Sequence, residues 1–191
     1  MDRDSTEPSE MFKFIADTEI YDEVVCKAIS GAKRQLWLAT ADLKDLHVHK
    51  AKRMVPLLEV LSDLIAKKVE IRLLHAKEPG PAFRKDFDRY PNLIEGLERM
   101  LCPRVHLKCV VVDRRLVYVG SANLTGAGLG AKSAKRRNFE SGIVTTDEAI
   151  VEQVMEQFDR IWRGDHCAQC DRKEFCDEYI DIVPAGTKPI S

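Results

Sequence analysis

The chain has 191 residues, of which 45% are hydrophobic and 32% are charged, a balance typical of a globular protein with a packed core. Its 30 Lys and Arg residues nearly cancel its 31 Asp and Glu residues. This balance excludes a uniformly basic nucleic-acid wrapper and an acidic tail protein, but it leaves room for a local basic patch. No apolar run approaches the roughly 18 residues of a membrane span, and the charged opening residues lack a signal-peptide core, so we expect a cytoplasmic protein with reduced thiols.

The spacing of apolar residues predicts helices alternating with strands, and therefore an α/β sandwich around a largely buried sheet. In chain order we expect a helix over 20–32, a strand over 35–41, a helix over 54–68, a strand over 69–74, one or two helices between 83 and 101, strands over 105–112, 116–120 and 139–145, and a helix over 148–162 capped by Asp147. Residues 1–10 are predicted to be a flexible N-terminus, 11–163 the main domain, and 164–191 a Cys-rich tail.

Four polar side chains lie where two of the predicted strands meet. His106 and Lys108 are two residues apart on a strand, so both leave the same face. If that strand forms a hairpin with the next one, Ser121 and Asn123 come close to them. Such a set suits a phosphoryl group, because Lys neutralises its oxygens and Ser and Asn donate hydrogen bonds to them. A histidine can attack phosphorus or move a proton near neutral pH.

The pattern His-x-Lys-x4-Asp-x6-Gly-Ser-x-Asn resembles the HKD motif of the phospholipase D superfamily. The residues that carry it are His106, Lys108, Asp113, Gly120, Ser121 and Asn123. The resemblance implies an αβα sandwich around a mixed, largely buried β-sheet, here with a short Cys-containing C-terminal tail. It also implies that residues 11–163 form the catalytic domain and that His106 becomes a covalent phosphohistidine. Glu140 is expected to accept the Nδ1 proton of His106, and Asp113 to support the site.

Members of this superfamily use two HKD motifs in each active site, and this sequence holds one. The only other His and Lys cluster, at 47–50, lacks the downstream Asp and the Gly-Ser spacing, so we interpret it as a solvated loop or a helix start. The resemblance therefore predicts a homodimer whose two-fold axis runs through the catalytic cleft, with one His106 from each subunit. A two-fold dimer is also the commonest soluble oligomer.

Short members with a single motif resemble bacterial endonucleases, so a metal-independent endonuclease acting on DNA or RNA is the leading hypothesis. A basic cluster in the loop after the motif could follow a nucleic-acid backbone. This cluster comprises Lys132, Lys135, Arg136 and Arg137, and a smaller one comprises Lys50, Lys52 and Arg53. The alternatives are a phospholipase or phosphatidyltransferase, and a nucleic-acid-binding subunit of a larger nuclease or helicase complex in defence or repair. A membrane partner is not expected.

Three cysteines near the C-terminus, Cys167, Cys170 and Cys176, form a C-x2-C-x5-C pattern. Thiolates at such spacing can hold a metal, and the pattern resembles part of the iron–sulfur motif of some CRISPR-associated and recombination nucleases. A structural [4Fe–4S] cluster and zinc are the two candidate occupants, and three reduced surface thiols are the alternative. The candidates for a fourth ligand are Cys26, Cys102, Cys109 and His166. The catalytic step itself is expected to need no cofactor.

Overall fold

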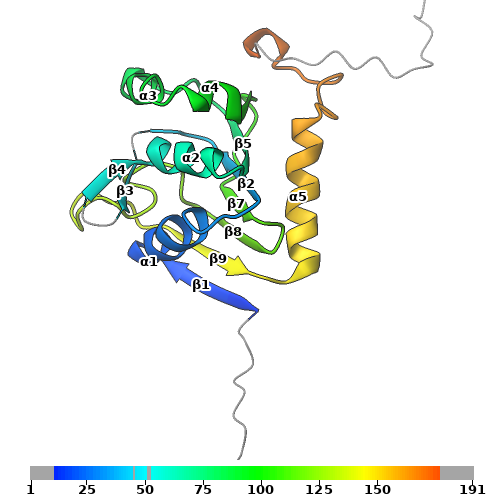
Figure 1. Ribbon diagram of the computed structural model, residues 1–191. Coiled ribbons are helices and arrows are strands. Elements are labelled where there is room, and N and C mark those ends of the chain that lie inside the picture. The colour runs from blue at the N-terminus through cyan, green and yellow to red at the C-terminus, as the bar shows by residue number, and fades with distance from the viewer. Residues whose placement is uncertain (1–10, 45, 51–52, 177–191) are drawn as a thin grey trace, which may run out of the picture.

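A mixed seven-stranded sheet forms the centre of the computed structural model, which describes residues 11–44, 46–50 and 53–176 (Figure 1). The predicted flexible segment 1–10 and residues 177–191 of the predicted tail lie outside the described residues. The sheet has the strand order β1-β9-β8-β7-β2-β5-β6, with β2, β5 and β6 parallel and the other neighbours antiparallel. Its strands are β1 (Phe12–Ala16), β2 (Gln35–Thr40), β5 (Glu70–His75), β6 (Leu97–Leu101), β7 (Cys109–Val112), β8 (Leu116–Gly120) and β9 (Ser141–Thr145).

Helices cover both faces of the sheet, as expected for an αβα sandwich (Figure 1). The helices are α1 (Thr18–Ile20), which continues into the π-helix η1 (Tyr21–Ile29), α2 (Leu57–Ala66), α3 (Pro81–Phe87), α4 (Asn92–Gly96), α5 (Glu148–Trp162) and the 3₁₀-helix η2 (Lys173–Phe175). In the part of the chain that the structure describes, no helix is long and apolar enough to cross a membrane.

The two faces of the sheet bury separate apolar clusters because side chains alternate along each strand. On one face, η1 and α2 pack over strand residues such as Leu38 and Leu73. On the other face, α5 packs Phe158 against Trp37, with the two ring centroids 4.9 Å apart. The start of α5 follows the sequence prediction, since Asp147 Oδ1 accepts a hydrogen bond from the backbone N–H of Ile150 at 3.0 Å.

Several boundaries differ from the sequence prediction. Residues 97–101, expected to be helical, form the edge strand β6. In a run of only five residues, the spacing of the apolar side chains is compatible with either a helix or a strand. The helix expected from Met54 begins only after Pro56, because residues 53–56 form strand β4 (Arg53–Pro56). This strand pairs with β3 (His47–Lys50), where a loop or helix start was expected. Strand β1 was not predicted at all.

Asp113 anchors the far end of β7 to the start of β2. Its carboxylate accepts hydrogen bonds from the backbone N–H groups of Arg34 at 2.7 Å, Gln35 at 3.0 Å and Lys33 at 3.1 Å. Burial by itself raises the pKa of Asp113, but these N–H groups outweigh it and hold the pKa below its usual value. Asp113 has a φ of 53°, a left-handed conformation that Asp and Asn tolerate better than most residues.

Replacing this carboxylate with an amide tests the anchor. We expect Asp113→Asn to lower the free energy of unfolding by about 1–2 kcal/mol at pH 7, because hydrogen bonds to a charged acceptor are the stronger ones. Since the folded-state pKa is depressed, the stabilisation is present above the usual value of 3.8 and is lost as the pH falls through the folded-state pKa. Urea unfolding at several pH values measures both effects. The exposed Glu70→Gln is the control, and an equal loss in that variant would contradict the account.

Candidate active site

All motif residues except Asp113 gather at one end of the central strands, where β7 begins and its two neighbours end. β7 is antiparallel to both β8 and β2, so residues just before Cys109 lie beside the residues that follow Gly120 and Thr40. The backbone N–H of Gly120 donates to the carbonyl of Lys108 at 3.2 Å and fixes this register. The predicted hairpin is therefore confirmed, although the ladder of β7 starts at Cys109 rather than at Val105.

The ammonium group of Lys108 lies at this end of the central strands, and the residue is only 8% exposed. Its Nζ lies 3.0 Å from Nδ1 and 3.1 Å from Nε2 of His106, and it donates to the carbonyl of His106 at 2.9 Å. Burial lowers the pKa of Lys108, and the nearby charge of Glu140 opposes that shift in part. Within the described residues no carboxylate forms an ion pair with Lys108. The ring of His106, by contrast, belongs to an exposed residue and is open to an incoming group.

Asn123 is held so that its amide N–H groups remain available. Its Oδ1 accepts hydrogen bonds from the backbone N–H groups of Asp42 at 3.1 Å and Ala41 at 3.2 Å, and it lies 3.3 Å from the hydroxyl of Thr40. The hydroxyl of Thr40, which is fully buried, also accepts from the backbone N–H of Leu124 at 3.0 Å. With the oxygen engaged by backbone donors, the NH₂ group is the part of Asn123 left to bind a ligand.

Ser121 and Glu140 are hydrogen-bonded to each other. The hydroxyl of Ser121 donates to Oε2 of Glu140, and Nδ2 of Asn138 donates to Oε1 at 3.0 Å. The expected pairing of Glu140 with His106 is not formed among the described residues. The carboxylate is engaged by Ser121, which follows β8, and by Asn138, which precedes β9, while the ring of His106 lies against Lys108.

Asp113, which was grouped with the catalytic residues as support for the site, lies at the opposite end of β7 from Lys108. It is a structural anchor. The other predicted residues lie at the end of the sheet where β7 begins, and they are His106, Lys108, Ser121, Asn123 and Glu140. Two further residues there escaped the sequence analysis, namely Thr40 and Tyr118. A Cβ on Gly120 would lie 2.2 Å from the hydroxyl of Tyr118, so the motif glycine makes room for that ring. Burial raises the pKa of Tyr118 to about 12, which keeps its hydroxyl protonated.

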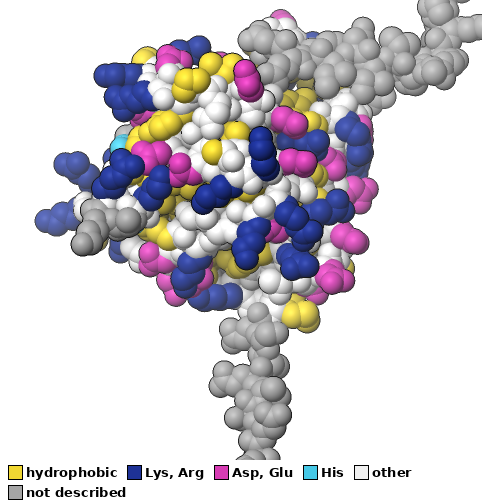
Figure 2. Space-filling model, viewed as in Figure 1, with side chains coloured by type: hydrophobic (Ala, Val, Ile, Leu, Met, Phe, Trp, Pro, Cys, Tyr) yellow, Lys and Arg dark blue, Asp and Glu magenta, His cyan; other side chains and the backbone are white. Residues whose placement is uncertain are grey.

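The basic cluster after the motif is accessible. Lys132, Lys135 and Arg136 are exposed and Arg137 is half-buried, and none of the four forms an ion pair with a described acidic residue. In the second cluster, Lys50 pairs with Glu59 at 2.9 Å and with Asp63, and Arg53 pairs with Glu59 at 2.6 Å; Lys52 lies outside the described residues. Only the first cluster is thus free of competing carboxylates. Figure 2 shows Lys and Arg interspersed with Asp and Glu over the face it displays, in keeping with the near-zero net charge.

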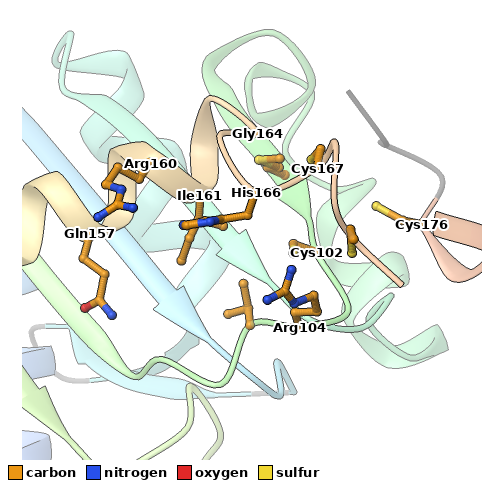
Figure 3. Close-up of a pocket in the computed structure, with 12 residues that line it drawn as sticks. Cys102, Arg104, Gln157, Arg160, Ile161, Gly164, His166, Cys167 and Cys176 are labelled. Carbon is orange, nitrogen blue, oxygen red and sulfur yellow. The ribbon is translucent and has the colours of Figure 1, made fainter. Parts of the chain in front are cut away.

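The three C-terminal cysteines and Cys102 line one pocket of about 320 Å³ (Figure 3). All four are half-buried, and none is in a disulfide. A hydrogen bond from the backbone N–H of Arg172 lowers the pKa of Cys170, as does the nearby guanidinium of Arg104. Among the described residues, no group of three His, Cys, Asp or Glu side chains stands ready-made to hold a metal ion.

The fold and the motif both have counterparts among known proteins. The family model described as "Cardiolipin synthase, PLD-like domain" matches residues 25–162. Nuc, a phospholipase D family member from Salmonella typhimurium, matches with a TM-score of 0.57 and 15% identity over 80% of this chain and 95% of that one. NucT from Helicobacter pylori matches with a TM-score of 0.58 and 13% identity over 80% and 96%.

A third similar structure is TrmBL2, an archaeal chromatin protein described as showing a novel mode of DNA binding. It matches with a TM-score of 0.57 and 16% identity, over 84% of this chain and 55% of that one. A search of the curated proteins found no match. At these identities the solved structures establish the fold alone. Because the family model covers most of the chain, the protein belongs to the phospholipase D-like family.

Proposed function

We propose that this phospholipase D-like phosphodiesterase hydrolyses the backbone of DNA or RNA without a metal ion, in an active site shared by two copies of the chain. The observation that carries the proposal is the buried ammonium of Lys108, whose hydrogen-bond partners among the described residues all belong to His106. A buried charge is costly without an opposite charge. The anionic phosphodiester supplies that charge directly beside the imidazole that attacks it.

The reaction would proceed in two displacements. A ring nitrogen of His106 attacks phosphorus, and the bond to the leaving oxygen breaks as that oxygen takes a proton from His106 of the partner subunit. The same partner imidazole then removes a proton from water, which attacks the phosphohistidine and restores His106. Lys108 neutralises the non-bridging oxygens, and the NH₂ group of Asn123 donates to one of them. Ser121 can donate there when it releases Glu140.

An exposed apolar patch on one face of the sheet supports a second copy of the chain. Phe14, Ile143 and Val119 are direct neighbours across β1, β9 and β8, and they are 69%, 45% and 45% exposed. Phe12, two residues from Phe14 on the same face, is 49% exposed. Large exposed apolar side chains gathered on one sheet face mark an interaction surface. Val119 shares a face with Val117, so the patch lies on the α5 side of the sheet and reaches the strand end that carries the motif only at Val119; a second copy docked there would be a two-fold partner.

The same patch favours a second candidate, a lipid phosphodiesterase or phosphatidyltransferase, because an exposed apolar surface can contact a lipid substrate. The exposed and unpaired cations of the loop at 132–137 argue instead for a polyanionic substrate, because they would follow its successive phosphates. We therefore place nucleic acid first.

Cleavage in the presence of EDTA tests the activity. Labelled single- and double-stranded DNA and RNA, and vesicles containing phosphatidylglycerol, are incubated with the wild type and with His106→Ala. We expect nucleic-acid cleavage by the wild type and a loss of about 10³-fold or more in the variant, because the nucleophile is removed. Cleavage of lipid alone would transfer the assignment to the second candidate. Tight nucleic-acid binding without cleavage would instead indicate a binding subunit.

The loop cations are tested separately from the chemistry. In the His106→Ala background, which prevents cleavage, Lys132, Lys135 and Arg136 are changed together to Ala. We expect weaker binding and a salt dependence of log K less steep by about 2–3 for duplex DNA, since each lost phosphate contact removes about 0.9. The matched control changes Lys33, Lys67 and Lys68, which are exposed near the opposite edge of the sheet. Equal effects of the two triple variants would contradict a role for this loop.

A further inference from the structure

Cys102 joins the C-terminal cysteines although it precedes them by 65 residues or more. The four thiols come from three segments, because Cys102 follows β6, Cys167 and Cys170 follow α5, and Cys176 follows η2 (Figure 3). The backbone N–H of Cys102 donates to the carbonyl of His75 at 2.9 Å, so its position is fixed by the sheet. The thiol of Cys176 lies 3.9 Å from the carbonyl of Leu101, the residue before Cys102. The tail thus meets the sheet edge at this thiol.

The other candidate ligands are placed elsewhere or are weaker. Cys109 is buried in the core between the sheet and α5, and burial raises the pKa of its thiol to about 12. Cys26 packs against the apolar cluster on the opposite face of the sheet. His166 lines the same pocket but is adjacent to Cys167, and two adjacent ligands meet one metal ion with difficulty. Cys102 is therefore the fourth thiol that the fold supplies.

We propose that Cys102, Cys167, Cys170 and Cys176 hold a metal centre, with an iron–sulfur cluster as its occupant. Four thiolates are soft ligands, which select zinc or iron–sulfur clusters over hard cations. Because the four thiols do not converge on one point, a multi-iron cluster, whose ligands are spread more widely than those around a single ion, fits them with less movement. Arg104 and Arg160 line the pocket and would offset the negative charge that four thiolates bring.

The thiols do not yet converge, so binding must draw the tail inward. The segment that has to move consists largely of turns, with the N–H of Cys167 bonded to the carbonyl of Gly164 at 2.8 Å and the N–H of Cys170 bonded to that of Cys167 at 3.0 Å. Cys102 stays in place on the sheet edge. The centre would then fasten the tail to the domain, a structural role separate from the chemistry of His106.

The experiment is purification without oxygen, followed by elemental analysis for iron, sulfide and zinc and by absorbance near 400 nm. We expect iron and sulfide in the wild type, and their loss in Cys102→Ser and Cys167→Ser. Cys26→Ser is the matched control and should keep its full content. Limited proteolysis supplies a second readout, in which both ligand variants should be cut after α5 faster than the wild type and the control. If Cys102→Ser does not fold, Cys167→Ser and Cys176→Ser still test the site from the tail.

Each outcome decides a part of the proposal. One zinc per chain that is lost in Cys102→Ser would keep the four-thiolate site and overturn the cluster. Full metal content in Cys102→Ser would overturn the role of that residue. A wild-type protein without either metal would overturn the site. None of these results bears on cleavage by His106, so the proposed function stands or falls separately.

Discussion

The chemistry of the protein depends on placing the Lys108 ammonium where the sheet leaves it 8% exposed. Pairing of β7 with β8 on one side and β2 on the other fixes that position, and burial then lowers the pKa of Lys108. Its donors meet only His106 in the described part of the chain. Burying the Lys108 ammonium without an opposite charge costs free energy on folding. An anion that binds beside it offsets that cost. The site therefore favours an anionic ligand before any substrate is bound.

The other groups of the site are arranged in advance around this charge. Backbone donors from the end of β2 engage Oδ1 of Asn123, which leaves its NH₂ group as the donor. Glu140 accepts a hydrogen bond from the hydroxyl of Ser121, and in the proposed mechanism Ser121 would leave this carboxylate for the phosphate. The proposed mechanism needs a second imidazole, which would come from another copy of the chain. The exposed apolar patch formed by Phe12, Phe14, Val119 and Ile143 is a candidate surface for that copy.

The sequence predicted the motif, the hairpin and the sandwich because these depend on local spacing: one residue between His106 and Lys108, and a short turn between β7 and β8. It did not predict the roles of Asp113 and Glu140, because their partners are backbone N–H groups and side chains that only the fold brings near. Strand β6 was predicted to be a helix because five residues are too few to distinguish the apolar periodicity of a helix from that of a strand. The approach of Cys102 to the tail likewise depends on tertiary structure, which spacing along the chain cannot show.

The most direct test of the shared active site is the activity of mixed dimers. Wild type and His106→Ala are unfolded together, refolded in varied proportions, and assayed for nucleic-acid cleavage in EDTA, with wild type diluted by buffer as the reference. If each site needs both imidazoles, an equal mixture retains about a quarter of the activity of undiluted wild type, because only wild-type pairs are active. If each chain acts alone, the mixture retains about half, and that result would contradict the shared site.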